Sequence, residues 1–520
     1  MNAIIVLMDT LRRDYLSCYG SERASAGLAA PVLTPNLDRF ANKGALMRQA
    51  YLGSSPCMPA RRELMTGRYE FPWRGWGPLE DDDLDMFSLL RSHGVKTAMV
   101  SDHYHLLERD AGNYHTGFEE WDMIRGQEHD PYVADPGIQT TIDHFTSSVY
   151  LTHQQNLHGR ERKEEELYSA RVFRGAADWL ERNGTHERRK EQPFCLYIDC
   201  FDPHEPWDPP DVLVERFDPG YDGKKPHSPS YGPASRFTEK ELRHMRALYA
   251  AETTVVDRWF GYFLDQVERL GLWEDTLIIA TTDHGYYLGE RGLVGKPDRV
   301  PLYPEMSRIP FMAYAPECEA GSRRSELVQL VDVFPTVLDA LGIPMPTADQ
   351  VEQSSIGIVG SAGKRAWDGV AHRSLFLHGK SLMSLLRGGD TRTHDLVCSA
   401  KYGDIVRLSD GEWALYLPPS PDAELYWYGL RAPGRLFGGK RGMLDKEKGR
   451  YPVRLPEPSC SLQLYHISTD PEETVDVAQE QPSVCKRLME DFRQWLKQIG
   501  APVEVAVRYG AELNADIQEG

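Results

Sequence analysis

The chain opens with Met1-Asn-Ala-Ile-Ile-Val-Leu-Met-Asp9, an apolar run that ends at an aspartate. Short apolar runs of the same kind occur at residues 96–100, 194–198 and 277–281. Uninterrupted apolar runs of this length are typical of strands that are buried on both faces, as in parallel sheets. The first run is far shorter than the roughly 20 residues that span a bilayer, so we expect a buried strand and no membrane segment.

Helical patterns separate these runs, and their alternation with strands predicts an α/β fold: a doubly wound, mostly parallel sheet flanked by helices. We expect this catalytic domain to occupy residues 1–390. Residues 391–520 then form a smaller C-terminal α+β subdomain with antiparallel strands and a terminal helix. The elements expected there are a hairpin at 405–417 that turns at Asp410-Gly411, a strand at 462–467 and a helix at 483–499. The helices expected in the larger domain span residues 37–43, 84–93, 165–182 and 239–270.

The composition excludes some functions. The formal net charge of −19 argues against a nucleic-acid partner, because phosphate backbones require a basic surface. The 8 cysteines are scattered among 520 residues without a C-x-x-C pair, which is too sparse for a disulfide scaffold. No basic, cleavable leader precedes the first apolar run, so we expect a cytoplasmic protein. An assembly of several copies is left open.

Polar residues follow each of the four apolar runs. These residues are Asp9, His103, His204 and the pair Asp283-His284. A single aspartate after a strand is more often a turn or helix cap than a ligand. In doubly wound sheets, however, the functional site forms at the carboxyl ends of the strands. Four such positions together predict a site at one edge of the sheet.

A cysteine lies in the run Ser54-Ser-Pro-Cys57-Met-Pro-Ala-Arg61-Arg-Glu-Leu-Met-Thr-Gly67. Pro59 suits the first turn of a helix and Gly67 suits its end, so Cys57 is expected at or just before a helix N-terminus. That position favours an anion or a thiolate, and Arg61 lies one turn further on. These features alone leave open both a buried structural cysteine and a reactive one.

The run Cys-x-Pro-x-Arg, followed by two residues, two apolar residues, Thr and Gly, resembles the signature of the sulfatase family in the alkaline phosphatase superfamily. Residues 9–14, 34–41, 282–285 and 464–474 are also similar to motifs of that family. The resemblance implies an alkaline phosphatase-like fold. It also implies that a formylglycine-generating enzyme, or an equivalent, converts Cys57 to formylglycine. One oxygen of the hydrated aldehyde would attack the ester and the other would expel the anion, which a thiol cannot do.

The same resemblance implies a metal site. Asp9, Asp283 and His284 would bind one divalent cation together with modified Cys57. Carboxylate oxygens suit calcium, magnesium or manganese, and the imidazole favours manganese or zinc. We expect Ca²⁺ or Mn²⁺, with Zn²⁺ and Mg²⁺ as alternatives. The ion would act as a Lewis acid on the ester.

The remaining catalytic candidates follow from the same motifs. Arg61, Lys296 and His103 are expected to bind the oxyanion. His204 and His105 are candidates for protonation of the leaving group, because histidine titrates near neutral pH.

Three departures from the family pattern bear on the substrate. Thr10 replaces a second aspartate, His284 replaces a frequent asparagine, and His103-Tyr104-His105 aligns with a Lys-x-His motif. These changes resemble the phosphonate monoester hydrolase and phosphodiesterase branch. We expect hydrolysis of a small anionic sulfate ester, with a phosphonate monoester or phosphodiester as the alternative. A non-catalytic anion-binding relative is a further alternative, whereas a phosphatase with a Ser or Thr nucleophile would need a hydroxyl residue at position 57.

Overall fold

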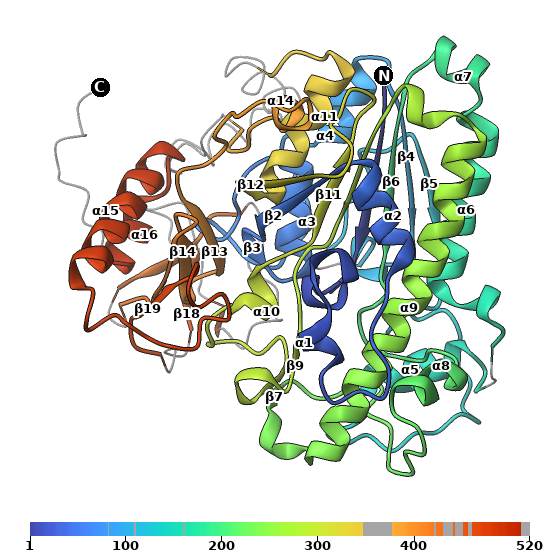
Figure 1. Ribbon diagram of the computed structural model, residues 1–520, viewed down its shortest axis with the longest axis horizontal. Helices are drawn as coiled ribbons and strands as arrows, with labels where there is room; N and C mark the ends of the chain where they lie inside the picture. The colour runs from blue at the N-terminus through green and yellow to red at the C-terminus, as the bar shows by residue number, and fades with distance from the viewer. Residues whose placement is uncertain are drawn as a thin grey trace.

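The computed structural model describes residues 1–81, 83–108, 111–159, 162–346, 377–420, 423–429, 440–441, 451–455 and 460–510. Its largest sheet has eight strands (Figure 1). In spatial order these are β12 (Ser322–Gln329), β2 (Ala45–Tyr51), β11 (Phe311–Tyr314), β8 (Thr276–Thr281), β1 (Asn2–Met8), β6 (Phe194–Cys200), β4 (Lys96–Ser101) and β5 (Glu120–Met123).

The four apolar runs form the adjacent strands β8, β1, β6 and β4, which are parallel to one another. This part of the prediction is confirmed. The strand β11 is antiparallel to both of its neighbours, so the sheet is mixed but mostly parallel. The outer strands β12, β2, β11 and β5 were not predicted. Only one of them, β11, is short and largely apolar; β12 and β5 are rich in polar residues.

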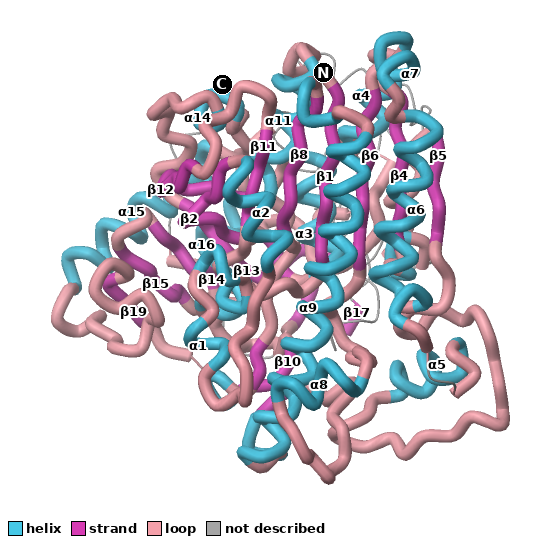
Figure 2. The backbone as a smooth tube through the Cα atoms, turned by 45° about the vertical axis from the view of Figure 1, so that its right-hand side comes forward, coloured by secondary structure: helices cyan, strands magenta, loops and turns pink. Residues whose placement is uncertain are grey.

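Helices cover both faces of the sheet, as predicted for a doubly wound fold. Alternate side chains of β1 point to opposite faces: Ile5 packs with one core cluster and Ile4 with the other. Figure 2 shows one helical layer in front of the strands. That layer contains α2 (Pro35–Lys43), α6 (Tyr168–Asn183) and α9 (Glu239–Arg269), and the opposite layer contains α3 (Cys57–Thr66), α4 (Met86–Ser92) and α11 (Val333–Leu341).

A second, five-stranded sheet is built mainly from the C-terminal part of the chain. The predicted hairpin is present, with β14 (Val406–Ser409) antiparallel to β15 (Trp413–Leu417). Its other strands are β19 (Gln463–His466), β13 (Val397–Lys401) and β3 (Ser54–Ser55), and α15 (Pro482–Gln498) packs against it. The strand β3 comes from the N-terminal part and pairs with β13. The second sheet therefore reaches the residues directly before Cys57, while a domain boundary at 390/391 stays a prediction.

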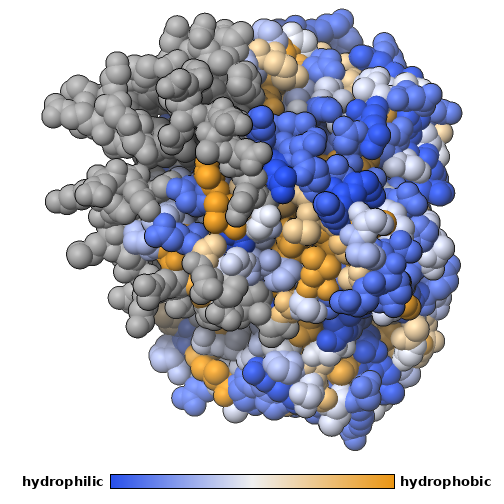
Figure 3. All heavy atoms as spheres, turned by 90° about the vertical axis from the view of Figure 1, so that its left-hand side faces the viewer, coloured by the Kyte–Doolittle hydropathy of each residue, from blue (hydrophilic) through white to orange (hydrophobic). Residues whose placement is uncertain are grey.

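The visible surface is ordinary for a folded domain. Figure 3 shows one face on which hydrophilic residues surround smaller hydrophobic patches. Within the described ranges, none of the helices combines the length and the apolar character needed to span a bilayer.

Candidate active site

The carboxyl ends of the central strands meet at one edge of the large sheet. Asp9 follows β1, His103 follows β4, and Asp283 and His284 follow β8. The register aligns these ends, because Met8 pairs with Cys200 and Leu7 with Thr281. All four side chains are completely buried. The fold thus brings together the residues that the sequence placed after separate strands.

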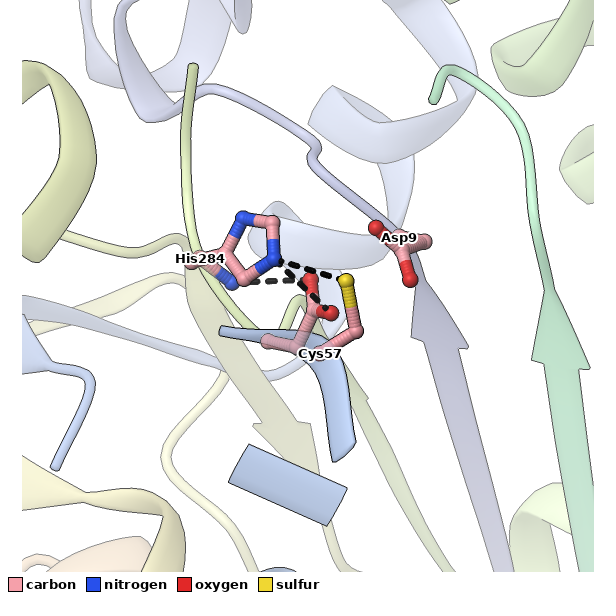
Figure 4. A group of neighbouring side chains, drawn as sticks. Asp9, Cys57 and His284 are labelled. Carbon is pink, nitrogen blue, oxygen red and sulfur yellow. Dashed lines mark hydrogen bonds and ion pairs between the residues drawn. The ribbon is translucent and has the colours of Figure 1, made fainter. Parts of the chain in front are cut away.

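Cys57 is the first residue of α3, as the sequence predicted, and its sulfur points toward His284 (Figure 4). The distance from Cys57 Sγ to His284 Nε2 is 3.1 Å. His284 Nδ1 donates a hydrogen bond to the carbonyl oxygen of Gly285 at 2.9 Å, so the unprotonated Nε2 faces the sulfur. A side chain at Gly285 would collide with the carbonyl oxygen of Glu305, because a Cβ atom would lie 1.9 Å from it.

The surroundings of Cys57 disfavour the thiolate form of its side chain. Burial raises its pKa well above the ordinary value, and the carboxylate of Asp9 raises it further. Lys296 and Arg61 lower the pKa but do not reverse this shift. Burial and the nearby carboxylates therefore oppose the thiolate form that a helix N-terminus favours.

Arg61 binds carboxylates from three strands. Its Nε and one terminal nitrogen each lie 2.7 Å from an oxygen of Asp199, and its other terminal nitrogen lies 2.7 Å from Asp283 Oδ2. An oxygen of Asp9 lies 2.9 Å away, and Arg61 also donates to the carbonyl oxygen of Cys57 at 3.2 Å. Asp199 was not predicted as a site residue, although it ends one of the apolar runs. Arg61 therefore fixes the carboxylates around Cys57 and has little donor capacity left for an anion.

Four of these side chains are close enough to share a cation. Asp9, Cys57, Asp283 and His284 each offer one ligand atom, and these atoms lie within 4.8 Å of one another. Thr10 orients two of them: its hydroxyl donates to Asp9 at 2.6 Å and its amide to Asp283 at 3.0 Å. Burial, followed by repulsion from Asp283, raises the pKa of Asp9 well above its ordinary value. A divalent cation would remove that repulsion, so this set of residues fits a metal ion.

Lys296 approaches Cys57 from the loop after β10 (Leu293–Gly295). Its Nζ lies 4.0 Å from Cys57 Sγ and donates a hydrogen bond to His204 Nε2. His204 Nδ1 in turn donates to the carbonyl oxygen of Glu205. Burial, followed by the charge of Lys296, lowers the pKa of His204 well below its ordinary value. His204 is therefore a neutral imidazole beside an ammonium group.

The two remaining catalytic candidates are His103 and His105. His103 Nδ1 is 3.8 Å from Asp9 and 3.7 Å from Asp199, which is too far for hydrogen bonds. Burial, and then Arg61, lowers the pKa of His103 to about 3, so its ring is neutral. The ring of His105 is 5.3 Å from that of His103, and its nitrogens face Glu108 and Glu128 rather than Cys57.

Comparison with known proteins supports the resemblance seen in the motifs. The family model described as Sulfatase matches residues 1–343. The multifunctional alkaline phosphatase superfamily protein PehA of Trinickia caryophylli is 25% identical over 394 residues, covering 67% of this chain and 75% of that protein. The N-acetylglucosamine-6-O-sulfatase of Bacteroides thetaiotaomicron is 22% identical over 501 residues, covering 80% of each chain.

The fold is also shared with solved structures. The phosphonate monoester hydrolase of Agrobacterium radiobacter superposes with a TM-score of 0.65 at 18% identity, covering 96% of both chains. At this identity the match shows the alkaline phosphatase-like fold alone. The match to the family model assigns the chain: the protein belongs to the sulfatase family of sulfuric ester hydrolases.

Proposed function

We propose that the protein hydrolyses a sulfate ester with a metal-bound formylglycine nucleophile derived from Cys57. The observation that carries this proposal is the position of Cys57 at the start of α3. Its sulfur lies 3.1 Å from His284 and 4.0 Å from Lys296, in a ligand set completed by Asp9 and Asp283. The raised pKa of the thiol makes unmodified Cys57 a poor nucleophile, which favours the modified residue in that role.

The ion would supply Lewis acidity, and the modified residue would supply a geminal diol. The surrounding side chains would position the substrate. Asp9, Asp283 and His284 hold the ion, for which Ca²⁺ or Mn²⁺ is our first expectation. Lys296 faces the transferred group as an oxyanion donor. His204 is our candidate for proton exchange with the leaving group.

A phosphonate monoester is the second candidate substrate, and the charge of the site favours it over a phosphate monoester. Arg61 is occupied by three carboxylates, which leaves Lys296 and the ion to balance the substrate. Sulfate esters, phosphonate monoesters and phosphodiesters carry one negative charge in the ground state, whereas phosphate monoesters carry two. The structural likeness to a phosphonate monoester hydrolase is consistent with this candidate.

Two measurements test the proposal. The mass of the peptide that contains Cys57, from protein made in a host with the converting enzyme, is expected to show formylglycine. A thiol mass there would rule out the nucleophile. Matched aryl sulfate and aryl phosphonate esters then rank the two substrates by kcat/KM, and a higher value for the phosphonate would reverse our order. Binding of both anions without turnover of either would indicate the non-catalytic alternative.

A further inference from the structure

A second group of histidines and glutamates lies beyond His103, outside the ligand set of Cys57. His105 belongs to a short 3-10 helix, Tyr104–Leu106, and Glu108 follows it. Glu128 and His129 come from the loop after β5 and complete the group. We call these four residues the His105 cluster.

The ligand atoms of the His105 cluster converge. His105, Glu108 and His129 each offer one atom, and these atoms lie within 4.8 Å of one another. His105 Nδ1 is 2.5 Å from Glu108 Oε2, and His129 Nε2 is 3.9 Å from Glu108 Oε1. Both imidazoles therefore direct one nitrogen toward the same carboxylate.

Glu128 contacts the opposite nitrogen of each ring. Its Oε2 lies 3.3 Å from His105 Nε2 and 3.0 Å from His129 Nδ1. It is 8% exposed, and that oxygen forms no hydrogen bond in the part of the chain that the structure describes. A carboxylate beside the outer nitrogen of a histidine can accept its N–H, which fixes the tautomer and leaves the inner nitrogen free to bind a metal. Here one buried carboxylate lies beside that nitrogen of both rings.

The charges of the cluster are also suited to a divalent cation. Two neutral imidazoles and two carboxylates carry two negative charges. A divalent ion would balance them, which avoids the cost of leaving a buried charge uncompensated.

We propose that His105 Nδ1, His129 Nε2 and Glu108 bind a second divalent transition-metal ion, with Glu128 orienting both imidazoles. Two imidazoles and one carboxylate match zinc with an open fourth position. The side chains of Glu108 and His129 are 27% and 29% exposed, so solvent can reach that position. This role for His105 replaces protonation of the leaving group, and it does not depend on the reaction at Cys57.

Metal content tests the proposal independently of activity. Full-length protein is stripped with a chelator, incubated with micromolar Zn²⁺, desalted and analysed by elemental mass spectrometry. Two ions per chain are expected for the wild type, and one each for Asp283→Asn and His129→Gln. The surface variant His186→Gln is the matched control and is expected to keep two. A wild type that holds no more zinc than His129→Gln, or two ions in His129→Gln, would overturn the proposal.

Two further readouts do not depend on the folding of His129→Gln. An anomalous difference map of zinc-loaded wild-type crystals is expected to show a peak between His105 Nδ1 and His129 Nε2, and its absence at full loading would contradict the site. Calorimetric titration of Asp283→Asn in buffers of different ionisation enthalpy is expected to show that Zn²⁺ binding releases protons. Adding Glu128→Gln is expected to weaken that binding by about 10- to 100-fold, whereas Glu187→Gln on the surface leaves it unchanged.

Discussion

Arg61 and Asp199 form a paired contact beneath Cys57, with Nε to Oδ2 and a terminal nitrogen to Oδ1 both at 2.7 Å. Neither side chain is exposed to solvent. Burial would raise the pKa of Asp199, but Arg61 outweighs burial and lowers it to about 2. The pair links the second turn of α3 to the end of β6, and it fixes the guanidinium that also contacts Asp9 and Asp283.

We predict that Asp199→Asn lowers the free energy of unfolding by about 1.5–3 kcal/mol, because Arg61 loses charge-assisted hydrogen bonds while Asp9 and Asp283 still balance its charge. Urea unfolding measures this loss. We also expect lower kcat, since the carboxylates around Cys57 lose their alignment. Asp178→Asn, on the exposed face of α6, is the control and is expected to leave both quantities unchanged. An unfolding free energy equal to that of the wild type would mean that Asp199 contributes no net stability.

Lys296→Met is expected to reduce kcat/KM by about 10²- to 10³-fold, the usual effect of removing one oxyanion donor. The pH profile gives a second readout. Lys296 lowers the pKa of His204, so its removal is expected to raise that pKa and move the acidic limb of the residual activity to higher pH. Lys190→Met on the surface is the control. If the acidic limb does not move, the titration of His204 does not determine the pH dependence of the activity.

Lys401 positions the loop that carries Lys296. Its Nζ donates to the carbonyl oxygens of Lys296 and Pro297 at 2.8 and 3.0 Å and contacts Asp298 at 2.7 Å. We predict that Lys401→Met lowers kcat by about 10- to 100-fold through misplacement of Lys296, with KM changing less. Lys401→Arg is expected to recover part of the loss. A fall in melting temperature with unchanged kcat for the folded fraction would indicate a merely structural role.

Glu63 makes stability depend on pH in a direction opposite to that of a salt-bridged carboxylate. Burial raises its pKa from 4.5 to about 8, while Ser54 and the amide of Glu70 offset part of the shift. The folded state therefore holds a proton that the unfolded state releases near pH 4.5. The stability associated with this proton is complete below about pH 4.5 and is lost as the pH rises toward 8.

We accordingly predict that Glu63→Gln removes this loss. Relative to the variant, the wild type is expected to lose on the order of 5 kcal/mol of unfolding free energy across that pH range, at about 1.4 kcal/mol per pKa unit. Denaturant unfolding at several pH values measures the difference, with Glu187→Gln as the surface control. A constant difference between wild type and Glu63→Gln would show that Glu63 keeps an ordinary pKa.

The sequence by itself determined the central sheet and the start of the active-site helix. Apolar runs of this length are typical of strands buried between two layers of helices. The positions of these runs along the chain therefore predicted β1, β4, β6 and β8. Cys57 was placed at a helix N-terminus by the proline and glycine around it, and α3 begins there. The polar residues after the strands were placed at one edge because the carboxyl ends of parallel strands meet.

The tertiary structure decided what these residues do to one another. Asp199 was overlooked because an aspartate in a strand end has no distinctive local pattern; its contact with Arg61 spans 138 positions of the sequence. Burial and Asp9 raise the pKa of the Cys57 thiol, and both are properties of the assembled site. Lys401 acts on Lys296 only because β13 pairs with β3 beside Cys57. Charge, burial and long-range pairing depend on which segments meet, and local sequence does not contain that information.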